Sequence, residues 1–243
     1  YFLSLKIFRF LKHIYQKKIS NLFDKKYNFY NYGESKNYVN KKKLFNLFPY
    51  KPDILIVHFT AHFINFKTIY EIQKFTGCKV LFNIVDTSFM TGGCHWSWDC
   101  KGYVKECKNC PAITSIKLKN LAHRNFLEKN YYLNKINFEV NVSSSFAAKQ
   151  IKISHLFKTK TPSFIYYPID QEIFKPQKNP NTSIEKNIFF GTQDFSNPSK
   201  GVVYFLEALI VLSKILTKNQ IKHIIINIAG DKSKMSIPKN FKT

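Results

Sequence analysis

Short apolar stretches separated by segments with helical spacing constrain the fold of this chain more than any other feature. The apolar stretches cover residues 53–59, 79–86, 138–144 and 162–169, and the helical segments cover 64–77, 115–134 and 144–154. Continuous runs of β-branched and aromatic residues are typical of strands that are buried on both faces. Strands of this kind that alternate with helices indicate a parallel sheet covered by helices. We therefore predict an α/β fold with a Rossmann-like domain over 51–176.

The same pattern starts again after a polar segment. Residues 175–186, KPQKNPNTSIEK, contain two prolines and predict a linker, with a domain boundary near 176–186. A strand at 187–191, a helix at 202–217 and a strand at 223–230 follow. We expect 187–243 to be the start of a second Rossmann-like parallel-sheet domain. We also expect this domain to be incomplete, because two strands with one helix cannot cover their own sheet.

The first 50 residues define a fold less clearly. Residues 1–50 are rich in lysine and aromatic residues, with a helix predicted over 2–18 and little order expected over 24–44. The chain begins with Tyr1 rather than Met, so we expect it to be an internal fragment. No apolar run reaches the roughly 18 residues of a membrane span, and no signal peptide is recognisable. These features predict a cytoplasmic protein.

The net charge of +23 suggests a polyanionic partner, but the composition of that charge argues against a specific one. Only two of the 38 basic residues are arginines, which leaves 36 lysines. Specific nucleic-acid readers depend on arginine for bidentate contacts to bases and phosphates. We therefore predict a solvated lysine surface without a specific nucleic-acid site. Such a surface should attract anionic lipid headgroups and anionic substrates.

A twenty-residue stretch, TGGCHWSWDCKGYVKECKNC over 91–110, holds four of the five cysteines. They are Cys94, Cys100, Cys107 and Cys110. Four thiolates can bind a structural zinc ion tetrahedrally, and His95 could replace one sulfur. Disulfides in any of three connectivities, or free thiols, are the alternatives, although a reducing cytoplasm disfavours disulfides. We predict structural zinc in this cysteine loop (91–111), and we expect Cys78 to be a small core residue.

The cysteine loop follows the predicted strand 79–86. Ligands of parallel α/β folds bind at the carboxyl ends of the strands, which is where this loop begins. Thr91 offers a hydroxyl group, and Gly92 and Gly93 offer backbone that a ligand can approach closely. Alternatively, the two glycines only allow a tight turn above the cysteines.

Several segments of the chain resemble a known family. Residues 86–113, DTSFMTGGCHWSWDCKGYVKECKNCPAI, resemble the signature HDMW-x-x-TGGCHY…C…C-x-x-CP of a branch of glycosyltransferase family 4. These are bacterial retaining sugar transferases of the GT-B fold that build surface polysaccharides, including lipopolysaccharide. Further segments similar to that family are 52–65, 141–154, 165–176 and 189–209. The resemblance covers about 52–230 in the same order along the chain.

The resemblance implies an activity and a location. It implies transfer of a hexose from a nucleotide-sugar donor to a lipid-linked or polysaccharide acceptor. The expected site of this transfer is the inner face of the cytoplasmic membrane. It also implies that no catalytic metal is needed, so cationic side chains and helix N-termini must neutralise the donor phosphates. Lys200 and Gly201, at the start of the predicted helix 202–217, are the candidates for that role, together with Gly92 and Gly93 of the cysteine loop.

The catalytic candidates are His95, as a hydrogen-bond partner of the sugar or a general base, and Asp86, which could orient a hydroxyl group. The chain departs from the family pattern at Val85, where the family has histidine, and at Ser199, where it has arginine. His58 and His62 are therefore alternatives to His95. The Glu-x7-Glu segment that grips the donor sugar in the family would lie beyond residue 243. We accordingly expect the 243-residue chain to be inactive by itself.

Other residues have structural interpretations. Trp96 and Trp98 are expected to cover the zinc knuckle, and Glu172 and Phe174 to pack at the hinge between domains. Two other classes of function compete with the transferase. One is a basic zinc-binding protein that binds nucleic acid, for which we would expect a compact module with arginines and exposed aromatic residues. The other is an inactive scaffold.

Overall fold

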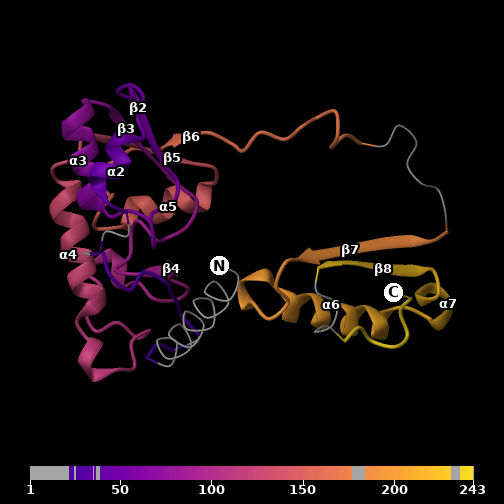
Figure 1. Ribbon diagram of the computed structural model, residues 1–243. Coiled ribbons are helices and arrows are strands. Elements are labelled where there is room, and N and C mark those ends of the chain that lie inside the picture. Colours follow the sequence, from indigo (N-terminus) through magenta and orange to yellow (C-terminus); the bar gives the residue numbers. More distant parts are fainter. Residues whose placement is uncertain are drawn as a thin grey trace, which may run out of the picture. The chain divides into compact units, whose positions relative to one another are not determined.

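The computed structural model describes residues 22–24, 26–34, 36, 39–176, 184–230 and 236–242. The chain divides into two compact units, Tyr1–Ile169 and Asp170–Thr243 (Figure 1). The helix predicted over 2–18 lies outside the described residues. None of the described helices is both long and apolar enough to cross a lipid bilayer.

A four-stranded parallel sheet forms the centre of the first unit. Its strands are β2 (Ile54–Val57), β3 (Lys79–Ile84), β5 (Phe138–Val142) and β6 (Ser163–Phe164), in that spatial order. These strands coincide with the four apolar stretches, so the predicted parallel sheet is confirmed. β6 is shorter than predicted. After Phe164 the chain makes one more ladder bond, from Ile165 N to Val142 O, and then runs exposed to Pro168, which has no N–H to donate.

The helices of this unit are α3 (Phe66–Thr76), α4 (Leu121–Leu133) and α5 (Ser145–Ile153). α3 and α4 contact each other beside the sheet (Figure 1). α3 begins at the Asn65 cap, whose side chain accepts from Thr68 N, and ends at Gly77 in the left-handed conformation, φ 77°. The predicted helix 115–134 is divided, because a single 3-10 turn over Ile116–Leu118 precedes α4.

The apolar core lies on the face of the sheet that these helices cover. Phe82 of β3 is fully buried and lies within 6.0 Å, centroid to centroid, of the rings of Phe66, Phe89, Phe138 and Phe157. The opposite face is open at the edge strand β2, where Ile54 and Ile56 are 58% and 53% exposed. The expectation that every strand is buried on both faces is therefore wrong at β2.

A small antiparallel pair was not predicted. β1 (Asn28–Phe29) pairs with β4 (Cys94–Trp96) of the cysteine loop, and a short helix, α2 (Lys41–Asn46), precedes β2. Little order was expected over 24–44, and that expectation is wrong for the described residues. Their order comes from distant partners, since Tyr30 N and Asn31 N both donate to Gly93 O, at 2.8 and 2.9 Å.

The second unit contains a separate parallel pair, β7 (Lys186–Thr192) and β8 (Ile224–Gly230). Between them run α6 (Val202–Ile215) and the single turn α7 (Lys218–Ile221). The predicted β-α-β order is confirmed, and the described strands of this unit do not pair with those of the first sheet. Leu209, Ile226 and Phe241 are buried in its small core.

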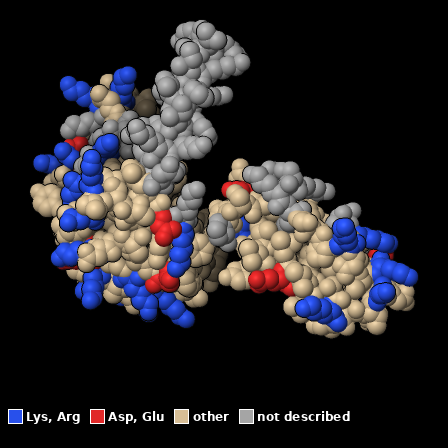
Figure 2. All heavy atoms as spheres, turned by 90° about the horizontal axis from the view of Figure 1, so that it is seen from below, with Lys and Arg blue, Asp and Glu red and all other residues tan. Residues whose placement is uncertain are grey.

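Lysine and arginine side chains are spread over the visible face of each unit and are not gathered into a single patch (Figure 2). This distribution agrees with the predicted solvated lysine surface. It gives no support to a localised basic groove for nucleic acid on that face.

The buried aromatic core predicts a large effect of one truncation. We expect Phe82→Ala to lower the free energy of unfolding by about 3–5 kcal/mol, since the cavity has no water-accessible side through which to relax. Phe146→Ala is the matched control on the outer side of α5, where Phe146 is 62% exposed, and it should cost less than about 1 kcal/mol. Urea unfolding of the two variants measures the difference. Equal losses would contradict the placement of the core.

Candidate functional site

Asp86 and His95 form a pair at the carboxyl end of β3. His95 Nδ1 lies 3.2 Å from Asp86 Oδ2. Asp86 follows the strand directly, is 5% exposed, and accepts a 2.6 Å hydrogen bond from Ser88 N on its other oxygen. Thr87 donates from both its N–H and its hydroxyl to His95 O, each at 3.0 Å, which fixes β4 against the end of β3. The two predicted catalytic residues, nine positions apart, are therefore adjacent in space.

A second set of polar side chains lies at the same edge of the sheet and is linked by hydrogen bonds. Asn141 Nδ2 of β5 donates to Asn83 Oδ1 of β3 at 2.6 Å, and Asn83 Nδ2 lies 2.9 Å from Nδ1 of His58, which follows β2. Because the amide donates, His58 Nδ1 is an acceptor and its ring proton is on Nε2. His58 is thus occupied by a structural hydrogen bond. The two asparagines, in KVLFNI and FEVNV, are polar interruptions of apolar strands, and this signal could have revealed them in the sequence.

Aromatic rings surround the exposed side of His95. The ring centroids of Tyr30, Phe59 and Trp96 lie 6.3, 5.6 and 5.4 Å from that of His95. His62 lies against Tyr30 at 4.8 Å. The His95 side chain is 32% exposed, so a ligand can reach its ring while the Asp86 side stays closed to water.

The four cysteines of the loop line one cavity of about 20 Å³, together with Gly92, Gly93 and Gly102. All are free thiols. The hydrogen bond between Cys94 and Cys110 lowers the pKa of Cys110 to about 7 and, together with burial, raises that of Cys94. Burial raises the pKa of Cys107 to about 12. In the described part of the chain, no three His, Cys, Asp or Glu side chains stand at metal-ligand spacing.

The short strand β4 separates the cysteine cluster from the Asp86–His95 pair. Successive side chains of a strand point to opposite faces. Cys94 accordingly packs with Phe29 and Ala112 beside the other cysteines, while His95 faces Asp86. The alternative in which His95 replaces a sulfur ligand is therefore not supported. Neither Trp96 nor Trp98 lines the cysteine cavity, and Trp98 is 48% exposed, so the predicted cover over the knuckle is not observed.

Gly92 and Gly93 are packed against the chain itself. A Cβ atom on Gly92 would overlap the carbonyl group of Ala122 in α4, and one on Gly93 would overlap the ring of Phe29. The Thr91 hydroxyl is also satisfied internally, since it donates to Cys94 O at 2.7 Å. Both glycines are required for packing. Their contact with a donor sugar or phosphate stays a prediction.

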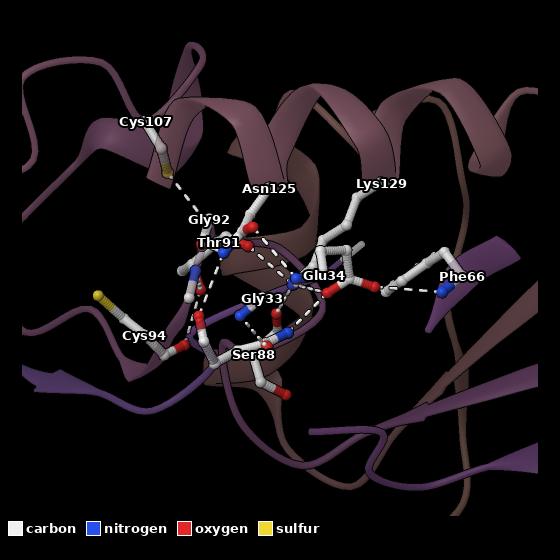
Figure 3. Close-up of polar contacts among 12 residues, drawn as sticks. Gly33, Glu34, Phe66, Ser88, Thr91, Gly92, Cys94, Cys107, Asn125 and Lys129 are labelled. Carbon is white, nitrogen blue, oxygen red and sulfur yellow. Dashed lines mark hydrogen bonds and ion pairs between the residues drawn. The ribbon is translucent and has the colours of Figure 1, made fainter. Parts of the chain in front are cut away.

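A buried ion pair that the sequence analysis missed holds this loop in place (Figure 3). Lys129 Nζ of α4 lies 3.7 Å from Glu34 Oε2, and their side chains are 2% and 1% exposed. The ammonium also donates to Ser88 O at 2.6 Å and to Thr91 O at 2.9 Å. Glu34 Oε1 accepts from Phe66 N, the first amide of α3, at 3.1 Å. One ion pair thus joins the N-terminal segment, two helices and the loop.

Asn125, one turn before Lys129 in α4, completes this network. Its Oδ1 accepts from Glu34 N at 3.1 Å, and its Nδ2 donates to Asn31 O and Gly92 O at 3.1 and 2.9 Å. Positions i and i+4 share a helix face. Asn125 and Lys129 lie on the face of α4 that carries its buried apolar residues, so two polar residues in an apolar stripe were the available signal.

In the second unit, Lys200 is exposed and Gly201 caps α6. Gly201 has φ 72°, a conformation that favours glycine, and no side chain caps the first turn of the helix. The leading amides of α6 therefore lack a side-chain acceptor. Phe174 is 71% exposed, and Glu172 forms an exposed ion pair with Lys175 at 3.4 Å, so their hinge role stays a prediction.

Comparison of the chain with protein-family models, with curated proteins and with solved structures gives no match. The resemblance to glycosyltransferase family 4 therefore stays a prediction.

The ion pair predicts a strong and specific response to mutation. Lys129→Met keeps the approximate length of the side chain but leaves the Glu34 carboxylate buried without its cation. It should lower the free energy of unfolding by about 3–5 kcal/mol. Lys149→Met, at an exposed position of α5, is the control and should change it by less than about 0.5 kcal/mol.

A double-mutant cycle with Glu34→Gln separates the pair from general packing effects. Direct coupling predicts that the Glu34→Gln/Lys129→Met variant loses less stability than the sum of the single variants, by more than about 1 kcal/mol in chemical denaturation. Strictly additive losses would show that the two charges do not stabilise each other.

Proposed function

We propose that this chain belongs to a retaining hexosyltransferase that uses a nucleotide-sugar donor and a lipid-linked or polysaccharide acceptor, in the synthesis of cell-surface polysaccharide. The observation that carries the proposal is the Asp86–His95 pair at the carboxyl end of a parallel strand. Ligands of open α/β sheets bind at that edge. The order of the family-like segments along the chain gives additional support.

The pair has a definite chemical use in this proposal. His95 Nδ1 lies 3.2 Å from Oδ2 of the buried Asp86 carboxylate, an oxygen that has no hydrogen-bond partner among the described residues. In this proposal the carboxylate keeps the ring proton on Nδ1, which leaves Nε2 as the acceptor. Nε2 then accepts a hydrogen bond from a sugar hydroxyl group and holds it in a fixed orientation. The rings of Tyr30 and Phe59 restrict the space beside it and exclude water. Fixed positioning of this kind lowers the barrier without a bound metal.

The second unit belongs, in this proposal, to the nucleotide-sugar-binding domain of a GT-B architecture. The departing nucleoside diphosphate develops negative charge during transfer. The uncapped amides of α6, with the positive end of its helix dipole, and the ammonium group of Lys200 are suited to stabilise that charge. Gly201 keeps the approach to these amides free of a side chain.

The expected location is the cytoplasmic side of the membrane. The net charge of +23, with basic side chains spread over the face that Figure 2 shows, favours peripheral association with anionic lipids, which would keep the enzyme close to a lipid-linked acceptor. The competing nucleic-acid hypothesis receives less support, because the cysteine loop is embedded between β3 and α4 and does not stand as a separate module.

The first test of the proposal is the catalytic pair. In the protein expressed from its complete reading frame, His95→Ala should reduce hexosyl transfer by about 10²-fold or more. Asp86→Asn should reduce kcat by a comparable factor, because the amide no longer selects the Nδ1–H tautomer. His58→Ala is the comparison variant and should retain most of the activity. A greater loss in His58→Ala than in His95→Ala would overturn the assignment.

The second test concerns the donor phosphates. Lys200→Ala in the same protein should lower kcat/KM for the nucleotide sugar on the order of 10²-fold, because one preorganised charge contact is lost. Lys214→Ala removes an equally exposed lysine from the last turn of the same helix, where the dipole repels phosphate, and should have no effect. Equal effects of the two variants in a labelled-donor assay would refute the proposed phosphate site.

A further inference from the structure

The four cysteines of the loop come from separate short segments and meet around one small cavity. Cys94 lies on β4, Cys100 precedes the 3-10 turn Gly102–Val104, and Cys107 and Cys110 follow that turn. Cys94 lies in one packed cluster with Cys107 and Cys110. At Gly102 a Cβ atom would lie 3.5 Å from Cys100 Sγ and 3.8 Å from Cys107 Sγ, so these sulfurs border the same volume.

Backbone amides point at two of the four sulfurs. Gly92 N donates to Cys107 Sγ at 3.3 Å, and Gly102 N donates to Cys100 Sγ at 3.4 Å. A thiol sulfur is a weak acceptor, whereas a thiolate is a strong one, so amide donors of this kind stabilise the deprotonated form. Such donors are the usual second layer around metal-bound thiolates.

The knuckle between the last two cysteines has an unusual backbone. Cys107 has a positive φ of 53°, which non-glycine residues other than Asn and Asp rarely adopt, and Asn109, at 51°, tolerates this region more readily. For Cys107 this conformation costs on the order of 1–3 kcal/mol, which other interactions must offset. A ligand that both Cys107 and Cys110 bind would supply that interaction.

From these observations we propose that Cys94, Cys100, Cys107 and Cys110 bind one Zn²⁺ ion as a tetrahedral tetrathiolate. The four thiols lose their protons to solvent as four zinc–sulfur bonds of about 2.3 Å form, which leaves a local charge of about −2. The sulfurs do not stand at that spacing in the described residues, so the loop contracts as the zinc–sulfur bonds form.

The metal would act as a structural clip next to the candidate site. Cys94 stands on β4 beside His95, so an ion on the Cys94 side fixes the strand that presents His95 to Asp86. This inference does not rest on the proposed transferase function. Metal content and metal spectroscopy test it without any measurement of activity.

The first measurement uses the unmodified protein, purified without chelator. Elemental analysis should find close to one zinc per chain, and a mercurial reagent should release it as four thiols react. After exchange, Co²⁺ should give the visible bands of a tetrahedral thiolate complex, with sulfur-to-metal charge transfer of the intensity of four ligands. Protein that contains no zinc above background and whose native thiols all alkylate freely would overturn the proposal. Disulfides found by mass spectrometry without reduction would overturn it as well.

Variants identify the ligands. Cys107→Ser and Cys110→Ser should each abolish stoichiometric zinc binding or weaken it by more than about tenfold. Cys78→Ala is the matched control, since Cys78 is also buried but lies in the apolar core away from the cavity, and it should retain one zinc. If a serine variant does not fold, the charge-transfer intensity of the unmodified protein still counts the thiolate ligands. A count below three would contradict the site.

Discussion

The buried ion pair between Lys129 and Glu34 determines how the first unit is assembled around its sheet. An ammonium group removed from water needs hydrogen-bond acceptors and a counter-charge. Lys129 donates to Ser88 O and Thr91 O, and Glu34 Oε2 lies 3.7 Å away as the counter-ion. The carboxylate is likewise saturated by the side chain of Asn31 and the first amide of α3. Both charged groups therefore have polar partners within the chain itself.

Such a pair contributes more to specificity than to net stability. The desolvation of two charges offsets most of their attraction, whereas an unpaired buried charge costs several kcal/mol. Any displacement of the segment 88–91 would remove two acceptors from Lys129 at once. We infer that the pair selects the path of the loop, and through it the position of Asp86, which stands only two residues before Ser88.

Features of the fold and of the site could be predicted from the sequence where the residues that define them lie close together along the chain. Continuous apolar runs gave β2, β3, β5, β7 and β8 because such a run is readable within a single strand. Asp86 and His95 could be predicted as site residues because both belong to one short motif. Glu34 could not, since its amide bonds to Asn125, 91 positions away, and its segment has no apolar period. Lys129 was inconspicuous among 36 lysines, although its position on the buried face of α4 distinguishes it.

Gly92 and Gly93 fix the position of β4, the strand that follows them. β4 presents Cys94 to one side and His95 to the other, and a shift of one residue would exchange the two faces. Gly92 lies against the backbone of Ala122 and Gly93 against the ring of Phe29, with no room for a Cβ atom at either position. These contacts fix where β4 begins. The TGGCH sequence therefore sets the register of β4, which places the cysteine sulfurs on one side and the Asp86–His95 pair on the other. This packing role accounts for the presence of glycine at positions 92 and 93 without any contact to a ligand.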